Sequence, residues 1–124
     1  MSPWEQNFDM ENLYLRFLQI ANVIQRGSLS ELDETSIALL NEIAVSHLNG
    51  NALPVSQAMG LANLASATTI HRKLDELRIA GYIEQTFQGS NRRTKYLVPT
   101  AATHAYVKKM SEAMAVAARS VSSC

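Results

Sequence analysis

Residues 66–98 read SATTIHRKLDELRIAGYIEQTFQGSNRRTKYLV and begin with a helical pattern of apolar residues. The apolar residues that recur at helical spacing on one face are Ile70, Leu74 and Leu77. Ser66 is a favoured N-cap residue, and Gly81 suits the left-handed conformation in which many helices end. The sequence therefore predicts a helix over residues 66–80.

The second half of this stretch predicts a β-hairpin. Residues 82–87 and 94–98 have the composition of strands, and the polar residues 88–93 between them include Gly89. An isolated hairpin is only marginally stable in water. We therefore expect this hairpin to pack on a helical body while its tip, residues 88–93, extends outward.

Helical patterns account for most of the remaining chain. Further helices are expected over residues 11–27, 33–48, 55–61 and 100–120, with Asp33 as the N-cap of the second. The predicted fold class is mainly α with a small β-hairpin (α+β). We expect a single domain over residues 1–124, in which the N-terminal helix 11–27 and the C-terminal helix 100–120 flank a core of residues 33–98.

Composition is that of a globular protein, with 47% hydrophobic and 18% charged residues in a chain of 124. No apolar run approaches the roughly 18 residues of a membrane span, and the first residues lack the order of a secretory signal. We therefore expect a cytoplasmic protein without a membrane partner.

The formal net charge is zero, but the charges are unevenly distributed along the chain. Residues 1–50 carry two basic and seven acidic residues, whereas residues 51–124 carry nine basic and four acidic residues. Between Ser66 and Tyr96 there are six basic and three acidic residues. Such asymmetry indicates a polyanionic partner for the second half of the chain.

Two helices joined by a tight turn and followed at once by a hairpin with a basic tip form a winged helix-turn-helix. The stretch Leu53–Val98 resembles the winged helix of the MarR family of bacterial transcription regulators. The segments that carry the resemblance are VSQAM at 55–59, SATTIHRKL at 66–74 and AGYI at 80–83. It implies a regulator that binds double-stranded DNA, with helix 66–80 in the major groove and the hairpin as a basic wing.

The outward face of helix 66–80 supplies the first group of candidate DNA contacts. On a wheel of about 100° per residue, Thr68 and Arg72 lie nearly opposite Ile70. Thr69 and His71 flank this face, Lys73 lies nearer the buried edge, and Ser66 opens the helix. We expect Thr68, Thr69 and Arg72 to read bases, and His71 and Lys73 to contact the backbone or base edges.

The wing supplies the second group of candidate contacts. Its basic residues Arg92, Arg93 and Lys95 cluster with Ser90 and Asn91, and no acidic residue interrupts them. The resemblance implies that Arg92 enters the minor groove, whose negative potential attracts long cationic side chains. Arg93 and Lys95 are then expected to contact phosphates or the groove.

The terminal helices carry more apolar surface than one partner face needs, and in the family such helices pair across a two-fold axis. The additional apolar residues are Leu15, Leu18, Val107, Met114 and Val121. A symmetric homodimer would place two recognition helices about 34 Å apart, which suits pseudo-palindromic sites. The alternative is that both helices complete the core of a monomer. Family members often respond to small phenolic or lipophilic ligands or to oxidation, so the resemblance also implies a small-molecule effector, which the residues do not identify.

We expect no enzyme activity, metal or cofactor, because the sequence lacks a catalytic constellation, ligand spacing and a phosphate-binding loop. His47 falls in an apolar stripe and is expected to be a hydrogen-bonded core residue, and the lone Cys124 is expected to be an inert terminal thiol. The alternative function is a winged helix that serves protein interaction, or replication or partition, without direct sequence-specific DNA binding.

Overall fold

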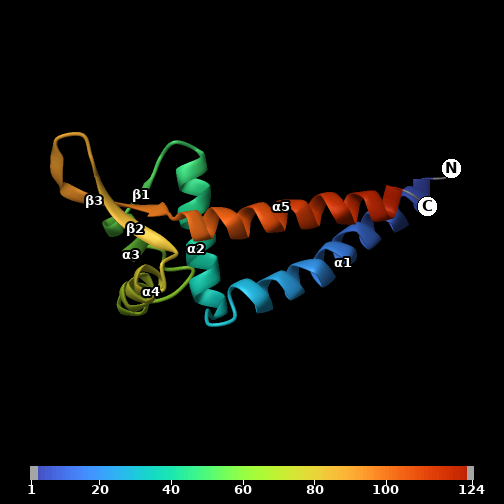
Figure 1. Cartoon of the computed structure of the whole chain (residues 1–124), viewed down its shortest axis with the longest axis horizontal. Coiled ribbons are helices and arrows are strands. Elements are labelled where there is room, and N and C mark those ends of the chain that lie inside the picture. Colours follow the sequence, from blue (N-terminus) through green and yellow to red (C-terminus); the bar gives the residue numbers. More distant parts are fainter. Residues whose placement is uncertain (1–2, 123–124) are drawn as a thin grey trace. The chain divides into compact units, whose positions relative to one another are not determined.

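The computed structural model describes the backbone of residues 3–122 and the side chains of residues 12–119 (Figure 1). The chain divides into two compact units, one of Met1–Ser30 with Ala105–Cys124 and one of Glu31–His104. Cys124 and the side chain of Val121 lie outside the described residues. In the described part of the chain, no helix combines the length and apolar character needed to cross a membrane.

The unit Glu31–His104 is mainly helical with one small antiparallel sheet, which confirms the predicted fold class. Its elements are α2 (Glu34–Leu48), β1 (Leu53–Pro54), α3 (Val55–Met59), α4 (Ala67–Ile79), β2 (Ile83–Gln88), β3 (Asn91–Pro99) and the first turn of α5 (Ala101–Ser122). The core of this unit is made by Leu39, Leu40 and Ile43 of α2, the stripe Ile70, Leu74 and Leu77 of α4, and Ile83 and Leu97 of the sheet. The predicted apolar face of α4 is thus confirmed.

Both ends of α4 are fixed by local hydrogen bonds. The Ser66 hydroxyl accepts a bond from the Thr69 backbone N–H at 3.3 Å, as predicted for an N-cap. At the other end, Gly81 has a φ of +88°, the Tyr82 N–H bonds to the Leu77 carbonyl, and the Gly81 N–H bonds to the Arg78 carbonyl. This pair of bonds is a Schellman motif. It ends α4 and turns the chain directly into β2.

The sheet has three strands in the order β1-β3-β2, one more than the sequence predicted. β1 was missed because it is only two residues long and ends in Pro54, which pairs with Tyr96 of β3. The expected tip at 88–93 was also wrong. Gln88 pairs with Asn91, so the loop consists of Gly89 and Ser90, and Arg92 and Arg93 belong to β3. Gly89 has a positive φ of 57°, as the first position of a two-residue hairpin turn requires.

Both strands of the hairpin are longer than predicted and reach the two-residue turn. Their polar side chains near the tip are tolerated because both faces of the hairpin are exposed there. Tyr82 joins the base of the hairpin to the start of the unit. Its hydroxyl donates to the Glu31 carboxylate at 3.0 Å, and its carbonyl accepts from the Thr103 hydroxyl at 2.6 Å. Burial, together with the Glu31 carboxylate, raises the pKa of Tyr82.

The other unit is built from α1 (Pro3–Ser28) and most of α5. α1 begins earlier than the expected residue 11, and Pro3 at its first position matches the preference of proline for helix starts. The buried side chains of this unit include Ala21, Leu29, Tyr106, Ala113 and Ala117. The Gln25 side-chain amide donates to the Tyr106 hydroxyl at 3.2 Å and links the two helices.

Candidate nucleic-acid interface

The outward face of α4 presents the short polar and basic side chains that the sequence predicted. Thr68, His71 and Arg72 are exposed, and Thr69 is half-buried beside the fully buried Ile70. The Ser66 hydroxyl donates to the Thr69 hydroxyl at 3.0 Å, so both side chains take part in the N-cap. Thr68 and Arg72, four residues apart, therefore lie on the same exposed face of α4.

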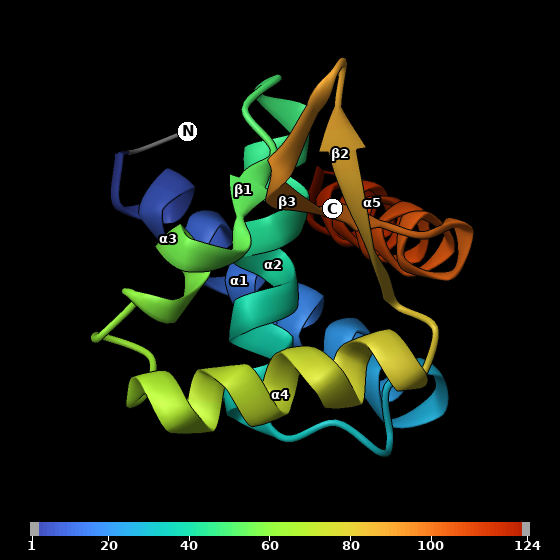
Figure 2. The same cartoon turned by 90° about the vertical axis from the view of Figure 1, so that its left-hand side faces the viewer.

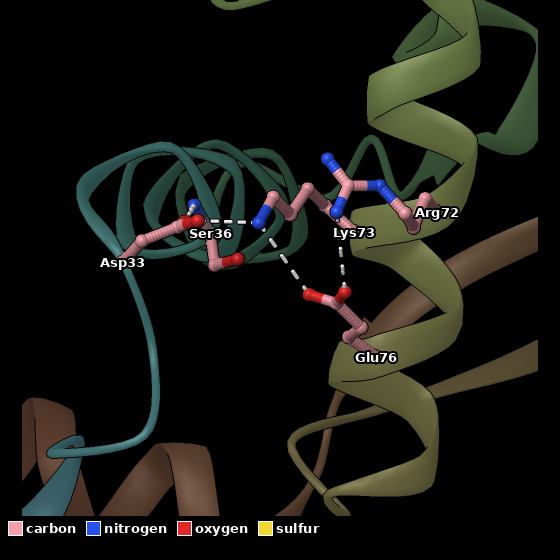
Figure 3. Close-up of polar contacts among 5 residues, drawn as sticks. All are labelled: Asp33, Ser36, Arg72, Lys73 and Glu76. Carbon is pink, nitrogen blue, oxygen red and sulfur yellow. Dashed lines mark hydrogen bonds and ion pairs between the residues drawn. The ribbon is translucent and has the colours of Figure 1, made fainter.

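Lys73 is placed differently from the other predicted contacts. Its side chain is only 10% exposed, and its ammonium forms an ion pair with the Asp33 carboxylate and lies 3.5 Å from a Glu76 carboxylate oxygen (Figure 3). The pKa of Lys73 is raised, chiefly by its hydrogen bond to Asp33. Lys73 therefore links α4 to the start of α2, and its ammonium is directed towards the carboxylates of Asp33 and Glu76.

Asp33 carries two bonds at once. Its carboxylate accepts a hydrogen bond from the Ser36 backbone N–H at 2.8 Å, which caps α2 as predicted, and it accepts another from Lys73. The bond from Lys73, followed by that from Ser36, lowers the pKa of Asp33 from 3.8 to about 2. The start of α2 is thereby joined to α4 by an ion pair as well as by the apolar core of the unit.

The exposed cations of α4 all have acidic neighbours on the same helix. Arg72 lies 3.9 Å from Glu76, and Asp75 lies 3.6 Å from His71 and 3.4 Å from Arg78. These pairs span one turn of the helix and are half exposed, so each contributes little to stability. They do reduce the positive potential of the α4 surface.

The wing, defined as residues 85–96, has the opposite electrostatic character. Ser90, Asn91, Arg92, Arg93 and Lys95 are all exposed. Within residues 12–119, none of the three wing cations forms an ion pair with an acidic side chain. The Asn91 side-chain oxygen accepts a bond from the Arg93 backbone N–H at 2.9 Å and stiffens the turn. Within the unit Glu31–His104, the lysines and arginines without an ion pair to a described acidic side chain are therefore those of the wing.

Phe87 is a wing residue that the sequence reasoning missed. The Arg92 guanidinium lies over its ring, 5.4 Å from the centroid, and the Phe87 side chain is 38% exposed. Phe87 lies in β2 where the register between Thr86 and Gln88 is irregular, which alters the direction of side chains along the strand. An aromatic residue close to an arginine across a short hairpin turn is the signal that could have indicated this contact.

α4 and the β2–β3 hairpin lie on the same side of α2 within the unit Glu31–His104 (Figure 1). The view from that side shows α4 crossing below the sheet while the hairpin points away from it (Figure 2). The two elements that carry the sequence-predicted residues, α4 and the hairpin, thus lie on one side of one unit. A DNA duplex has two grooves that can accept these two elements separately.

No metal site accompanies this surface among the described residues, where no group of three or more His, Cys, Asp and Glu side chains could hold an ion. The prediction that His47 is a core residue was wrong, because its side chain is exposed at the end of α2. Its ring lies 6.0 Å from that of His104, centroid to centroid. The buried apolar residues of α2 end at Ile43, so its last turn, which contains His47, adds no buried side chain to the core.

A scan of the sequence against models of protein families gives no match, and neither does a search of the curated proteins. The fold, however, is similar to several solved structures. RV1404 from Mycobacterium tuberculosis aligns over 100% of this chain and 82% of its own, with a TM-score of 0.65 and 16% identity. The transcriptional regulator Tm0710 from Thermotoga maritima aligns over 92% of this chain and 78% of its own, with a TM-score of 0.63 and 17% identity.

MarR itself aligns over 89% of this chain and 78% of its own, with a TM-score of 0.54 and 19% identity. The predicted likeness to the MarR-type winged helix is therefore confirmed at the level of the fold. The helices on either side of the winged helix are included in these alignments, because they cover nearly the whole chain.

Proposed function

We propose that this protein is a sequence-specific, double-stranded DNA-binding transcription regulator that acts in the bacterial cytoplasm. The observation that carries the proposal is that α4, which has an exposed polar face, and the wing lie on one side of one unit, and that the wing cations form no ion pair with an acidic side chain among residues 12–119. The similarity of the fold to Tm0710, which is described as a transcriptional regulator, supports it.

In the proposed complex, α4 lies in the major groove and reads base edges. Arg72 donates two hydrogen bonds to a guanine, a pairing that its planar guanidinium fits. Thr68 and Thr69 lie near the start of the helix, where short side chains allow a close approach and the methyl groups can pack on thymine. His71 contacts the backbone. Lys73 takes a different role from the one the sequence suggested, since its ion pair with Asp33 holds α4 on α2.

The wing binds the minor groove and the adjacent phosphates. Arg92 extends from the Phe87 ring into the groove, and Arg93 and Lys95 contact phosphates, assisted by Ser90 and Asn91 at the turn. Because the wing cations have no acidic partner within the described residues, binding a phosphate costs them no existing ion pair.

The proposed active form is a homodimer assembled through the terminal helices. Exposed large apolar side chains occur on both: Tyr14, Leu15 and Val23 on α1, and Val107, Met114 and Val116 on α5. Exposed apolar surface of this kind is usually covered by a partner. A two-fold axis between the copies would present two α4 helices to half-sites about one DNA turn apart.

The test is selection of a binding site from random duplexes, followed by a salt titration of the selected sequence. Arg72→Ala should cost about 1 to 3 kcal/mol on that sequence and remove the preference at one base position. Arg93→Ala should weaken binding to all sequences alike and flatten the salt dependence by about one charge. Lys109→Ala, which removes an exposed charge from α5, is the matched control and should leave the preference intact.

Two outcomes would overturn the proposal. If the purified protein bound no duplex in a salt-dependent way, a winged helix used for protein interaction would be the better description. If wild type bound DNA but Arg72→Ala and Arg93→Ala both bound like wild type, as the Lys109→Ala control should, the surface would be wrongly assigned.

A further inference from the structure

Four charged side chains connect the N-terminus of α2 to the outward face of α4. The Asp33 carboxylate pairs with the Lys73 ammonium, which lies 3.5 Å from one oxygen of Glu76, and the other Glu76 oxygen lies 3.9 Å from Arg72 (Figure 3). The chain of contacts starts at the half-exposed N-cap of α2 and passes through the nearly buried Lys73 side chain. It ends at the arginine that the proposed function assigns to base reading.

Glu76 is an unexpected residue on this face. Its side chain is 47% exposed beside Arg72, on a helix proposed to lie against a polyanion, where an unpaired carboxylate would repel phosphates. Helix stability does not explain it either. An acidic residue four positions after a basic one is the less favourable order for a helical ion pair. Glu76 therefore needs another reason to be there.

Lys73 fixes the Glu76 carboxylate from the core side. The Lys73 side chain is 10% exposed, and its ammonium is held by Asp33, which is itself held by the Ser36 backbone N–H. Glu76 thus contacts one cation that cannot move freely and one, Arg72, that is 62% exposed. An anchored carboxylate of this kind restricts the rotamers of a long, flexible partner.

We propose that Glu76, anchored by Lys73, is a positioning residue that holds the Arg72 guanidinium extended along the face of α4 for base recognition. The inference rests on the proposed function and deepens it, because it concerns how the same site achieves specificity. A guanidinium has five N–H donors, so Arg72 can stay in its ion pair with Glu76 while it presents donors to a guanine. Fixing the side chain in advance lowers the entropy that base recognition costs.

The experiment compares Glu76→Gln with Asp75→Asn on the sequence selected by the wild-type protein and on a variant of it with the Arg72-dependent base pair exchanged. Both substitutions remove one carboxylate charge from neighbouring half-exposed positions of α4, so both relieve repulsion of phosphates equally. Glu76→Gln should lower discrimination between the two duplexes by about two- to fivefold, the range expected for an exposed ion pair. Asp75→Asn should change the affinity for both duplexes by the same factor.

Lys73→Met is the second variant, since it keeps the length and apolar stem of the side chain and removes the ammonium. Lys73→Met should lower the discrimination between the two duplexes, as Glu76→Gln does. The double variant should lose no more discrimination than either single variant, because both changes interrupt the same chain of contacts. Thermal unfolding of each variant separates this effect from loss of folded protein. A purely structural role for Lys73 would weaken binding to both duplexes equally.

The inference and the proposed function fail in different ways. If wild type shows no base preference that depends on Arg72, the proposed function is at fault. If wild type shows that preference and Glu76→Gln retains it in full, as Asp75→Asn is expected to do, the positioning role of Glu76 is refuted.

Discussion

Replacing Asp33 by Asn tests whether the ion pair between α2 and α4 stabilises the fold. Asn keeps a side-chain oxygen for the α2 cap but loses the charge that pairs with Lys73. The lowering of the Asp33 pKa from 3.8 to about 2 would correspond to about 2.4 kcal/mol if taken at face value. Because 52% of the Asp33 side chain is exposed, solvent screens the pair, and about 1 kcal/mol is the better expectation.

The pH dependence of this effect has a definite sign. The pKa of Asp33 is lower in the folded protein than in the unfolded chain, so the carboxylate stabilises the fold fully above about pH 4. The stabilisation is lost as the pH falls through the interval from 3.8 to about 2. The difference between wild type and Asp33→Asn should therefore be largest at neutral pH and should shrink below about pH 4.

Urea unfolding of both proteins, followed by circular dichroism at pH 7 and at pH 3, measures this difference. Glu34→Gln is the matched control, because it removes a neighbouring acidic charge from the first turn of α2 without touching Lys73. Only a few tenths of a kcal/mol are expected from it, through the helix dipole. Equal losses from the two substitutions at pH 7, or a loss from Asp33→Asn that is unchanged at pH 3, would refute the reasoning.

Two further substitutions test single contacts. Phe87→Leu keeps an apolar side chain but removes the ring beneath Arg92, so DNA binding measured by fluorescence anisotropy should weaken by about two- to fivefold, the range of an exposed cation–π contact. The same change in an Arg92→Ala background should have no effect, and an equal effect there would contradict the contact. Tyr82→Phe removes the hydrogen bond to Glu31 and should cost about 1 kcal/mol in urea unfolding. An unchanged unfolding midpoint would show that this bond contributes nothing net.

The local features of α4 could be predicted from the sequence because they depend on neighbouring residues. The Ser66 cap, the buried stripe Ile70, Leu74 and Leu77, and the left-handed Gly81 each follow from a preference that acts within a few residues. The exposure of Thr68 and Arg72 follows from the same helical periodicity.

Features that depend on distant residues could not be predicted in the same way. The partner of Lys73 is 40 residues away in sequence, and nothing local to α4 indicates that its ammonium turns inwards. The extent of the wing strands could not be predicted for a related reason. The polar stretch at residues 88–93 is typical of a loop, whereas cross-strand pairing and the turn at Gly89 extend both strands to Gln88 and Asn91. Sequence periodicity does not reveal strand pairing when neither face is buried.

Although the net charge of the chain is zero, α4 and the wing differ in whether their basic side chains are paired with acidic ones. The exposed cations of α4 already have acidic partners, so Arg72 stays paired with Glu76 when it meets an uncharged base, and its binding releases few counterions. The wing cations Arg92, Arg93 and Lys95 have no acidic partner among residues 12–119, and each phosphate they neutralise releases about 0.9 of a counterion.

This difference predicts where the salt dependence of DNA binding arises. Replacing the two phosphate-contacting wing cations, Arg93 and Lys95, by Ala should reduce the slope of log K against log salt by about 1.8 per protomer, whereas Arg72→Ala should reduce it by much less than one. A salt titration of the two variants on the selected duplex gives both slopes. If the slope of log K against log salt fell by the same amount for each charge removed in the two variants, α4 would bind phosphates as the wing does. Unequal slopes would mean that affinity depends mainly on the wing, while α4 supplies base discrimination without strong attraction to DNA of any sequence.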